Sequence, residues 1–463
     1  MRFIDLFAGL GGFHEALAGL GHECVFASEL NPELRDVYRR NFPDVAAHVY
    51  GDIRDAKENV PAHDVLCAGF PCQPFSKSGF QHGLLDETRG TLFHEIISIL
   101  TVHRPEFVLL ENVGNFERHD EGRTWAIVRR NLEDLGYSVR GTVHLASGGH
   151  GLISPHHFGH PHHRERFFIV GWQGGELPAD PFPRGDRRRT TTLTEIVQPD
   201  DQLTDVDRIE TALSQKQIEC IEHWNQLLHV LSPETSIPSV PIWGDELDAT
   251  YPFEDRTPFE EARLALLPGV DESHPACWEQ VQAMLLDLPS YARAESFPVW
   301  KKGFIRKNRA WFQEVSEAIP EGWAEVLKGF PPSLRKLEWN CKGEERDLWR
   351  YVLQFRPSGL RVKRYTSVPA LVAMTTTQIP ILGPKRRFIT RDEGKLLQGF
   401  PRDHVLPKTR EAAFSALGNA VHVDVVRRIA QNVLNHLDGL AAVPAPIDDV
   451  QAELAFLPGV QAA

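Results

Sequence analysis

The sequence predicts an α/β fold built on a doubly wound, mostly parallel sheet. Short apolar runs recur along residues 3–172, and most are followed by glycine or by a polar side chain, which is typical of buried strands that end at one edge of a sheet. The first run is followed by a glycine-rich turn and then by apolar residues at helical spacing. Ligands of open α/β sheets bind at the carboxyl edge of the strands, so the polar residues after each run are the first candidates for a site.

The whole chain has the composition of an ordinary globular protein. Its 463 residues are enough for two or three domains, with 42% hydrophobic and 24% charged residues. No apolar run is as long as a membrane span and the N-terminus resembles a strand more than a signal peptide, so we expect a cytoplasmic protein. The six cysteines include no Cys-x-x-Cys pair, which favours a reducing compartment over a disulfide framework or a zinc finger.

The net charge of −13 is spread unevenly along the chain. Residues 195–299 hold about 21 acidic and 5 basic residues, which leaves the remainder at about +3. Binding to nucleic acid is therefore decided by local patches and not by the overall charge.

The first three runs carry residues that suit a cofactor with a nucleoside. The turn at residues 8–12 contains three glycines, and Glu29 and Asp52 follow the second and third strands. An acidic side chain at the end of the second strand, as Glu29 is, commonly accepts hydrogen bonds from ribose hydroxyls, and Asp52 suits an exocyclic amine. The alternative is an ordinary tight turn with solvated acids. The glycine spacing is not the GxGxxG of dinucleotide sites, so S-adenosylmethionine fits better than NAD.

The fourth run, residues 64–68, leads to a candidate nucleophile, Cys72. A structural cysteine would more often lie inside the run, as Cys67 does, and an ordinary thiol is the alternative for Cys72 as well. The polar stretch 76–90 contains three glycines, and a loop of this length beside a nucleophile is usually a lid. Glu111 ends the fifth strand, so we expect it at the same sheet edge.

A histidine-rich stretch, residues 150–163, precedes two arginines. A metal site is one hypothesis for the histidines, but their spacing matches no usual ligand pattern and no cysteine or carboxylate lies among them. We therefore expect no metal. Arg164 and Arg166 stand before the apolar strand 167–172, where they either solvate the strand end or grip a phosphate or a base carbonyl.

An ordered set of motifs identifies a family. The chain resembles the DNA (cytosine-5) methyltransferases of bacterial restriction–modification systems, over roughly residues 1–172 and 385–435. In one departure, His162 follows Pro161 where the family usually has glutamine. The motifs that carry the resemblance are Asp5-Leu6-Phe7-Ala8-Gly9-Leu10-Gly11-Gly12, Pro71-Cys72-Gln73, Glu111-Asn112-Val113, Arg164-Glu165-Arg166, Gly399-Phe400-Pro401 and Gly418-Asn419-Ala420-Val421.

The resemblance implies a Rossmann-like S-adenosylmethionine-dependent methyltransferase domain with an inserted target-recognition domain. Residues 1–180 and 385–438 would form the catalytic and cofactor-binding domain, 181–384 the target-recognition domain with a long acidic insertion, and 439–463 a tail. The product of the cofactor would be S-adenosylhomocysteine. The implied cofactor contacts are Phe7, Gly9, Gly11, Gly12, Glu29, Asp52, Ile53, Asn419 and Ala420.

The same resemblance assigns catalytic roles. The Cys72 thiolate would add to carbon-6 of a cytosine flipped out of duplex DNA. Glu111 would relieve the charge at N3, and Arg166 would hold the O2 carbonyl with support from Arg164. The loop with Ser76 and Arg89 near phosphates would close over the base.

The middle segment suggests where DNA binds. Residues 205–231 look helical and the proline-rich span 233–275 does not. The first half of the segment is too acidic to face DNA, whereas three later basic runs are interleaved with aromatic residues, a pattern of nucleic-acid surfaces; solvated helix faces are the alternative. The candidate DNA contacts are Lys301, Arg306, Lys307, Arg309, Arg361, Lys363 and Arg364.

Three other functions share some of these features: a tRNA cytosine-5 methyltransferase, a catalytically silent DNA-binding regulator and a metal-dependent enzyme. The length of the insert and its basic stretches favour duplex DNA over tRNA, and the intact Pro71-Cys72-Gln73 motif argues against a silent regulator. We also expect a monomer and a possible partner endonuclease, while the recognised sequence cannot be read from one chain.

Overall fold

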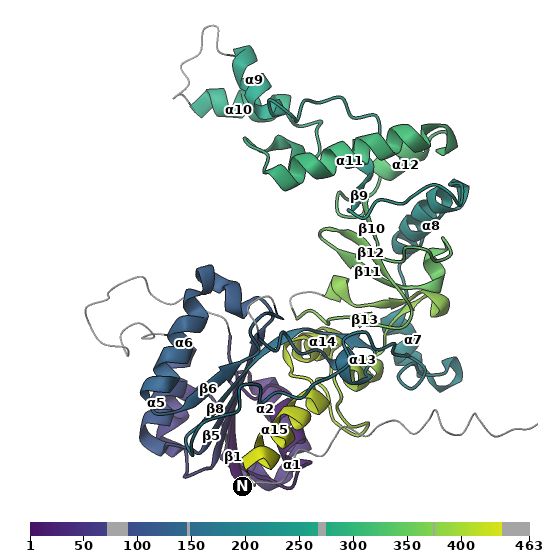
Figure 1. Cartoon of the computed structure of the whole chain (residues 1–463). Helices are drawn as coiled ribbons and strands as arrows, with labels where there is room; N and C mark the ends of the chain where they lie inside the picture. The colour runs from purple at the N-terminus through teal and green to yellow at the C-terminus, as the bar shows by residue number, and fades with distance from the viewer. Residues whose placement is uncertain (72–90, 146–148, 267–274, 374–375, 438–463) are drawn as a thin grey trace, which may run out of the picture.

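The structure is a computed structural model that describes residues 1–71, 91–145, 149–266, 275–373 and 376–437. Cys72, Ser76, Arg89 and the predicted lid 76–90 lie outside the described residues, so the roles predicted for them stay predictions. Figure 1 shows an α/β unit that contains the N-terminus and an elongated arm that rises from it to α9 and α10. Among the described residues, none of the helices has the length and apolar character that crossing a membrane would require.

The α/β unit is organised around a seven-stranded sheet of the described residues, in the order β3-β2-β1-β4-β5-β8-β6. The first five strands in chain order are parallel, and β8 runs antiparallel between β5 and β6. The order reverses at β1, where a ligand crevice is expected. The strands are β1 (Arg2–Leu6), β2 (Glu23–Ser28), β3 (Val49–Tyr50), β4 (Val65–Gly69), β5 (Phe107–Val113), β6 (Ser138–Gly141) and β8 (Arg166–Trp172).

Helices cover both faces of this sheet. On one face α1 and α15 pack against Val65 and Phe107, and on the other α5 and α6 pack against Leu66 and Val108. Burial on both faces explains why the strands are continuous apolar runs in the sequence, and it confirms the predicted doubly wound α/β fold. The helices of the unit are α1 (Gly12–Ala18), α2 (Pro32–Asn41), α3 (Ile53–Ala56), α5 (Leu92–His103), α6 (Arg123–Asp134), α13 (Arg391–Leu397), α14 (Arg410–Asn419) and α15 (Val423–Leu437).

The arm contains a second sheet, in the order β15-β14-β11-β12-β10-β9, in which β10 and β12 are parallel and the other pairs antiparallel. Its strands are β9 (Ile242–Trp243), β10 (Lys336–Trp339), β11 (Val352–Arg356), β12 (Gly359–Lys363), β14 (Ile381–Leu382) and β15 (Arg387–Phe388). Its helices are α7 (Asp205–Thr211), α8 (Gln215–Val230), α9 (Pro258–Leu266), α10 (Pro275–Met284), α11 (Val299–Val315) and α12 (Trp323–Lys328).

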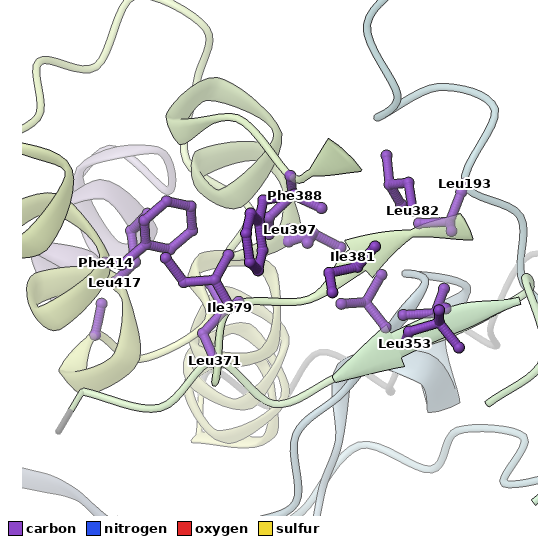
Figure 2. Close-up of a cluster of buried hydrophobic side chains, with 14 of the residues drawn as sticks. Leu193, Leu353, Leu371, Ile379, Ile381, Leu382, Phe388, Leu397, Phe414 and Leu417 are labelled. Atoms are coloured by element: carbon purple, nitrogen blue, oxygen red, sulfur yellow. The ribbon is translucent and has the colours of Figure 1, made fainter. Parts of the chain in front are cut away.

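The arm and the α/β unit share one hydrophobic core. Figure 2 shows Leu353 and Ile381 of the second sheet in the same cluster as Leu397 of α13 and Phe414 of α14. A further link is a two-stranded parallel ladder between β7 (His162–His163) and β13 (Val368–Pro369). The chain leaves the arm along β13, so this ladder holds the exit from the arm beside the loop that carries Arg164.

Two expectations about helices need correction. The predicted helix over 205–231 is two helices, α7 and α8, because Ser214 begins a new helix with a capping box. The span 233–275, expected to be non-helical, contains α9. The Thr257 hydroxyl accepts from the backbone N–H of Glu260 (3.2 Å) and the Glu260 carboxylate accepts from that of Thr257 (2.8 Å), so Thr257-Pro258 starts this helix.

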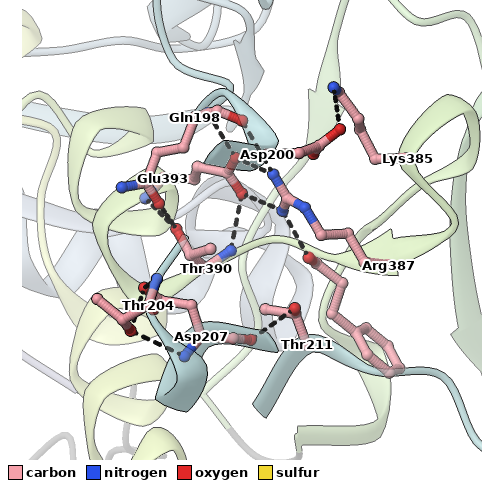
Figure 3. A network of polar contacts seen from close by, with 10 residues as sticks. Gln198, Asp200, Thr204, Asp207, Thr211, Lys385, Arg387, Thr390 and Glu393 are labelled. Carbon is pink, nitrogen blue, oxygen red and sulfur yellow. Dashed lines mark hydrogen bonds and ion pairs between the residues drawn. The ribbon is translucent and has the colours of Figure 1, made fainter. Parts of the chain in front are cut away.

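A buried polar network also joins the arm to the α/β unit (Figure 3). Arg387 of β15 donates two hydrogen bonds to Glu393 of α13, at 2.7 and 2.8 Å. The Glu393 carboxylate also accepts from the backbone N–H of Gln198 and of Thr390, and Thr390 caps α13 as predicted. Glu393 is completely buried. Its bonds to Gln198, in the segment that enters the arm, and to Arg387, in the segment that leaves it, tie both segments to α13.

We expect Glu393→Ala to destabilise this junction strongly. Removing one partner of a buried ion pair leaves the other charge uncompensated, which costs about 3–5 kcal/mol. Denaturant unfolding followed by tryptophan fluorescence would measure the change, with Glu411→Ala in the exposed first turn of α14 as the matched control. Equal stability of the two variants would contradict the assignment.

Candidate active site

The carboxyl ends of β1, β4 and β5 open into a cavity of about 610 Å³, within the range of small-molecule sites. Segments from both ends of the chain line it, together with residues 370–373 at the exit from the arm. The predicted site residues that line it are Phe7, Gly9, Gly12, Glu29, Glu111, Arg164, Arg166, Asn419 and Ala420.

The glycine turn and Glu29 form one end of this cavity. Phe7 and Gly9 have φ values of 56° and 55°, so the chain turns through left-handed conformations that glycine adopts readily and that cost other residues energy. The Glu29 carboxylate accepts from the backbone N–H of Gly9 (2.9 Å) and of Asn31 (2.8 Å). These bonds fix an acidic side chain at the end of β2, where ribose hydroxyls would be recognised.

Three predicted cofactor residues do not line the cavity. Gly11 has a φ of 82°, and a side chain there would come within 2.3 Å of the Phe42 ring, so Gly11 is needed for close packing on α2. The Asp52 side chain caps α3 and pairs with Arg54, which lowers its pKa. Ile53 is buried in the core.

The lining fits S-adenosylmethionine. Glu29 would take the ribose hydroxyls, the turn at Gly9 lets backbone approach the ligand closely, and the apolar side chains of Phe7 and Leu34 border the cavity. When bound, the cofactor supplies an electrophilic methyl group.

Glu111 lies at the opposite end of the cavity, on β5. It is only 7% exposed and pairs with Arg166, whose Nε lies 2.9 Å from the Glu111 Oε1. Burial raises the pKa of Glu111, and the charges of Arg166 and Arg164 partly oppose the increase. Across the sheet, Glu111 is in register with Gly69, the last residue of β4, and Pro71 is the last described residue before Cys72.

Asn112 is a site residue that the sequence analysis did not select. Its buried side-chain amide donates to the backbone carbonyl of Phe70 at 2.8 Å. This bond fixes the chain two residues before Cys72. Its position next to Glu111 in the motif was the available signal. The residue type alone does not tell whether an asparagine binds the substrate or holds the backbone, as it does here.

The structure places Arg164 differently from the expected support of a substrate carbonyl. Its side chain is buried and donates to the backbone carbonyls of Leu371 (3.3 Å), Gly418 (3.0 Å) and Ala420 (2.9 Å). Burial lowers the pKa of Arg164 to about 9, so the group keeps its charge near neutral pH. Arg164 therefore organises the cavity wall, and Arg166 is the arginine beside Glu111.

The basic residues of α11 have partners inside the arm. Both oxygens of Glu254 accept from Arg306, and Glu246 accepts from Arg309 at 2.9 Å. The Lys301 ammonium donates to the Tyr291 carbonyl. Lys307 is exposed.

The basic residues of the second sheet form another group. Arg361 pairs with Glu338 and Arg364 with Glu344. Lys363, at the end of β12, forms no ion pair with the residues that the structure describes. The DNA-contact roles of both groups stay predictions.

Comparison with known proteins identifies the chain. The model of the C-5 cytosine-specific DNA methylase family matches residues 1–242 and 297–435. The type II methyltransferase M.AluI of Cellulosimicrobium cellulans is 34% identical over 496 residues, which cover 92% of this chain and 90% of that protein. The type II methyltransferase M.HhaI of Haemophilus parahaemolyticus is 36% identical over 223 residues, which cover 47% and 64%.

These matches extend over both the α/β unit and most of the arm. They agree with the motifs, with the strand order and with a cavity that combines a nucleoside-type pocket and a buried Glu–Arg pair. The chain therefore belongs to the C-5 cytosine-specific DNA methylase family, and it is an S-adenosylmethionine-dependent DNA (cytosine-5) methyltransferase.

Proposed function

We propose that the enzyme methylates a flipped cytosine through a covalent bond between the Cys72 sulfur and carbon-6 of the base, with Glu111 and Arg166 holding the ring. The observation that carries the proposal is the pairing of Glu111 with Arg166. Glu111 lies near the end of β5, in register with Gly69 at the end of β4, the strand that leads to Cys72. A carboxyl group and a guanidinium side by side match the N3 and O2 positions of cytosine.

The proposed chemistry needs each of these groups. The Cys72 thiolate adds to carbon-6 and pushes an electron pair towards N3, where a proton from Glu111 neutralises it. The ring then has an enamine-like carbon-5, which takes the methyl group. Solvent then takes the carbon-5 proton, its bonding electrons form the carbon-5–carbon-6 double bond, and the thiolate leaves carbon-6. N3 returns its proton to Glu111, so the aromatic ring, Glu111 and Cys72 are all restored. Arg166 orients the base through O2.

Duplex DNA is the substrate class of the family, and the target base must leave the stack to reach a cavity of this kind, at a cost of a few kcal/mol. We propose that residues 181–384 recognise the sequence and that residues 1–180 and 385–438 bind the cofactor. We further propose a monomeric, cytoplasmic enzyme that protects host DNA against a partner endonuclease of a restriction–modification system.

The Cys72→Ser variant should transfer no methyl group yet still bind DNA, because a hydroxyl is a far weaker nucleophile than a thiolate. Incorporation of labelled methyl into unmethylated plasmid DNA would measure transfer, and tRNA would serve as a second substrate. Cys341→Ser, a buried cysteine of the arm, is the matched control. Full activity of Cys72→Ser, or a preference for tRNA, would refute the proposal.

The Glu111→Gln variant should slow transfer by about 10²- to 10⁴-fold, the usual contribution of a positioned acid. Because burial raises the pKa of Glu111, its carboxyl keeps a proton to higher pH than an ordinary glutamate. The protonated form is lost as pH rises through that pKa, so the ratio of wild-type to variant rates should shrink. A ratio that does not change with pH would argue against an acid role.

Arg164→Lys should weaken cofactor binding while Cys72 and Glu111 stay intact. A lysine ammonium cannot reproduce the planar fork that serves three carbonyls. Calorimetric titration with S-adenosylhomocysteine should show a roughly tenfold weaker Kd, as expected for losing one or two charge-assisted hydrogen bonds. Arg427→Lys, on the partly exposed side of α15, is the control and should bind as the wild type does.

A further inference from the structure

Most histidines of the stretch 150–163 have internal partners that explain them. The His162 imidazole bonds to the Leu397 carbonyl (2.9 Å), and His160 and His150 bond to Asp424 and Asp180. Among the described residues no group of three or more His, Cys, Asp or Glu side chains is arranged to hold a metal. His156 and His163 remain, and they face each other.

The two imidazoles share a hydrogen bond. The Nδ1 atoms of His156 and His163 lie 3.1 Å apart, and the rings are 4.2 Å apart between centroids. His156 also bonds to the backbone of Arg187 and to the Ser154 hydroxyl (2.8 Å). With its Nε2–H towards the Arg187 backbone, His156 has its lone pair on Nδ1. That nitrogen faces both the Ser154 hydroxyl and the Nδ1–H of His163, and it can accept from His163. The Nε2 of His163 has no hydrogen bond to the described residues.

The surroundings of this pair are cationic. Lys363 is close enough to lower the pKa of both His156 and His163, and Arg187 lowers the pKa of His156. Burial contributes most to the lowered pKa of His163, which falls to about 4. The buried His157, whose Nδ1 accepts from the backbone N–H of Ser154, meets His156 edge to face. The two charged neighbours, Lys363 and Arg187, form no ion pair with the described residues, so the neutral imidazole pair lies in a positive surrounding that suits an anion.

The nearby acids do not neutralise this group. Glu338 interacts with Lys363, but both of its oxygens already accept from Arg361 at 3.0 Å. Glu165, the other carboxylate that acts on Lys363, is exposed. Arg356 and Arg361 lower the pKa of Lys363 further. A phosphate would relieve the repulsion among these cations.

The group is linked to the active-site cavity through the backbone. His163 is in β7 and pairs with Pro369 of β13, and the residues that follow Pro369, 370–373, line the cavity. Arg166, three residues after His163, pairs with Glu111 inside it. Lys363 comes from the arm, so the group spans the junction of the two parts.

We propose that His163 and Lys363 bind a backbone phosphate of the DNA beside the flipped cytosine, with His156 as the positioning residue that supports a protonated His163. This rests on the proposed function and adds a phosphate contact to it. His163 would donate its Nε2–H to the phosphate and its Nδ1–H to His156, while Lys363 adds a second charge from the arm.

The site makes DNA affinity depend on pH. A phosphate raises the pKa of His163 above its low value in the free protein, so binding takes up a proton between the two values. The affinity of the wild type should therefore increase as pH falls below the pKa that His163 has in the complex, down to its pKa of about 4 in the free protein. His163→Gln should lose this part of the increase and bind roughly tenfold more weakly at the lower pH.

Fluorescence anisotropy with a random-sequence duplex tests the inference without knowledge of the recognition sequence. Lys363→Met should reduce the slope of log affinity against log salt by about one. His229→Gln and Lys216→Gln, both exposed on α8, are the matched controls and should behave as the wild type. His156→Ala should reduce the pH effect, and His156→Asn, which can still accept from His163, should keep more of it.

Identical pH dependence in wild type and His163→Gln would overturn the inference, as would an unchanged salt slope in Lys363→Met. Inorganic phosphate is the second probe. If it raises the Tm of the wild type but not of Lys363→Met while DNA affinity is the same in both, the site holds free phosphate and the proposal is wrong. Methyl transfer to plasmid is measured separately, so its absence would refute the proposed function and not the phosphate site.

Discussion

The arrangement of the active site depends on the buried guanidinium of Arg164. Placing a charge in the protein interior is costly unless its hydrogen-bonding groups are satisfied. Arg164 meets that condition with carbonyls of residues 371, 418 and 420, which belong to the exit from the arm and to the turn between α14 and α15. The loop with Arg164, the exit from the arm and the end of α14 must therefore be in place together, and they line one cavity with Glu111.

His162 gives a physical account of the one departure from the family motif. The family usually has glutamine at this position, and here the imidazole Nδ1 bonds to the Leu397 carbonyl at the end of α13. Burial lowers the pKa of His162 well below its ordinary value, so the ring is neutral and can donate one N–H, as an amide would. The imidazole thus links this loop to α13.

The strands and the polar residues at their ends could be predicted from the sequence, because burial on both faces imposes continuous apolar runs and parallel strands end at one edge. That reasoning placed Glu29 and Glu111 at the cavity. It failed where the partner of a residue is distant in sequence. Arg164 bonds to carbonyls more than 200 residues away, and Gly11 is fixed by the Phe42 ring; no local pattern reports either contact.

The acidic insertion shows that the free charges of a surface are also hard to predict from sequence, because the partners of charged residues can be distant. Residues 243–296 fall outside the family match and pack their own apolar side chains, with Trp243 and Tyr251 against Ile305 of α11. Their acids pair with Arg306 and Arg309, 52 and 63 residues away. Two arginines of a basic helix that look free in the sequence are thus paired with the segment before it. Lys307 of α11 and Lys363 of β12, in contrast, form no ion pair with the described residues, so the partners of a basic residue, and not the basic run itself, decide how much of its charge is free to meet an anion.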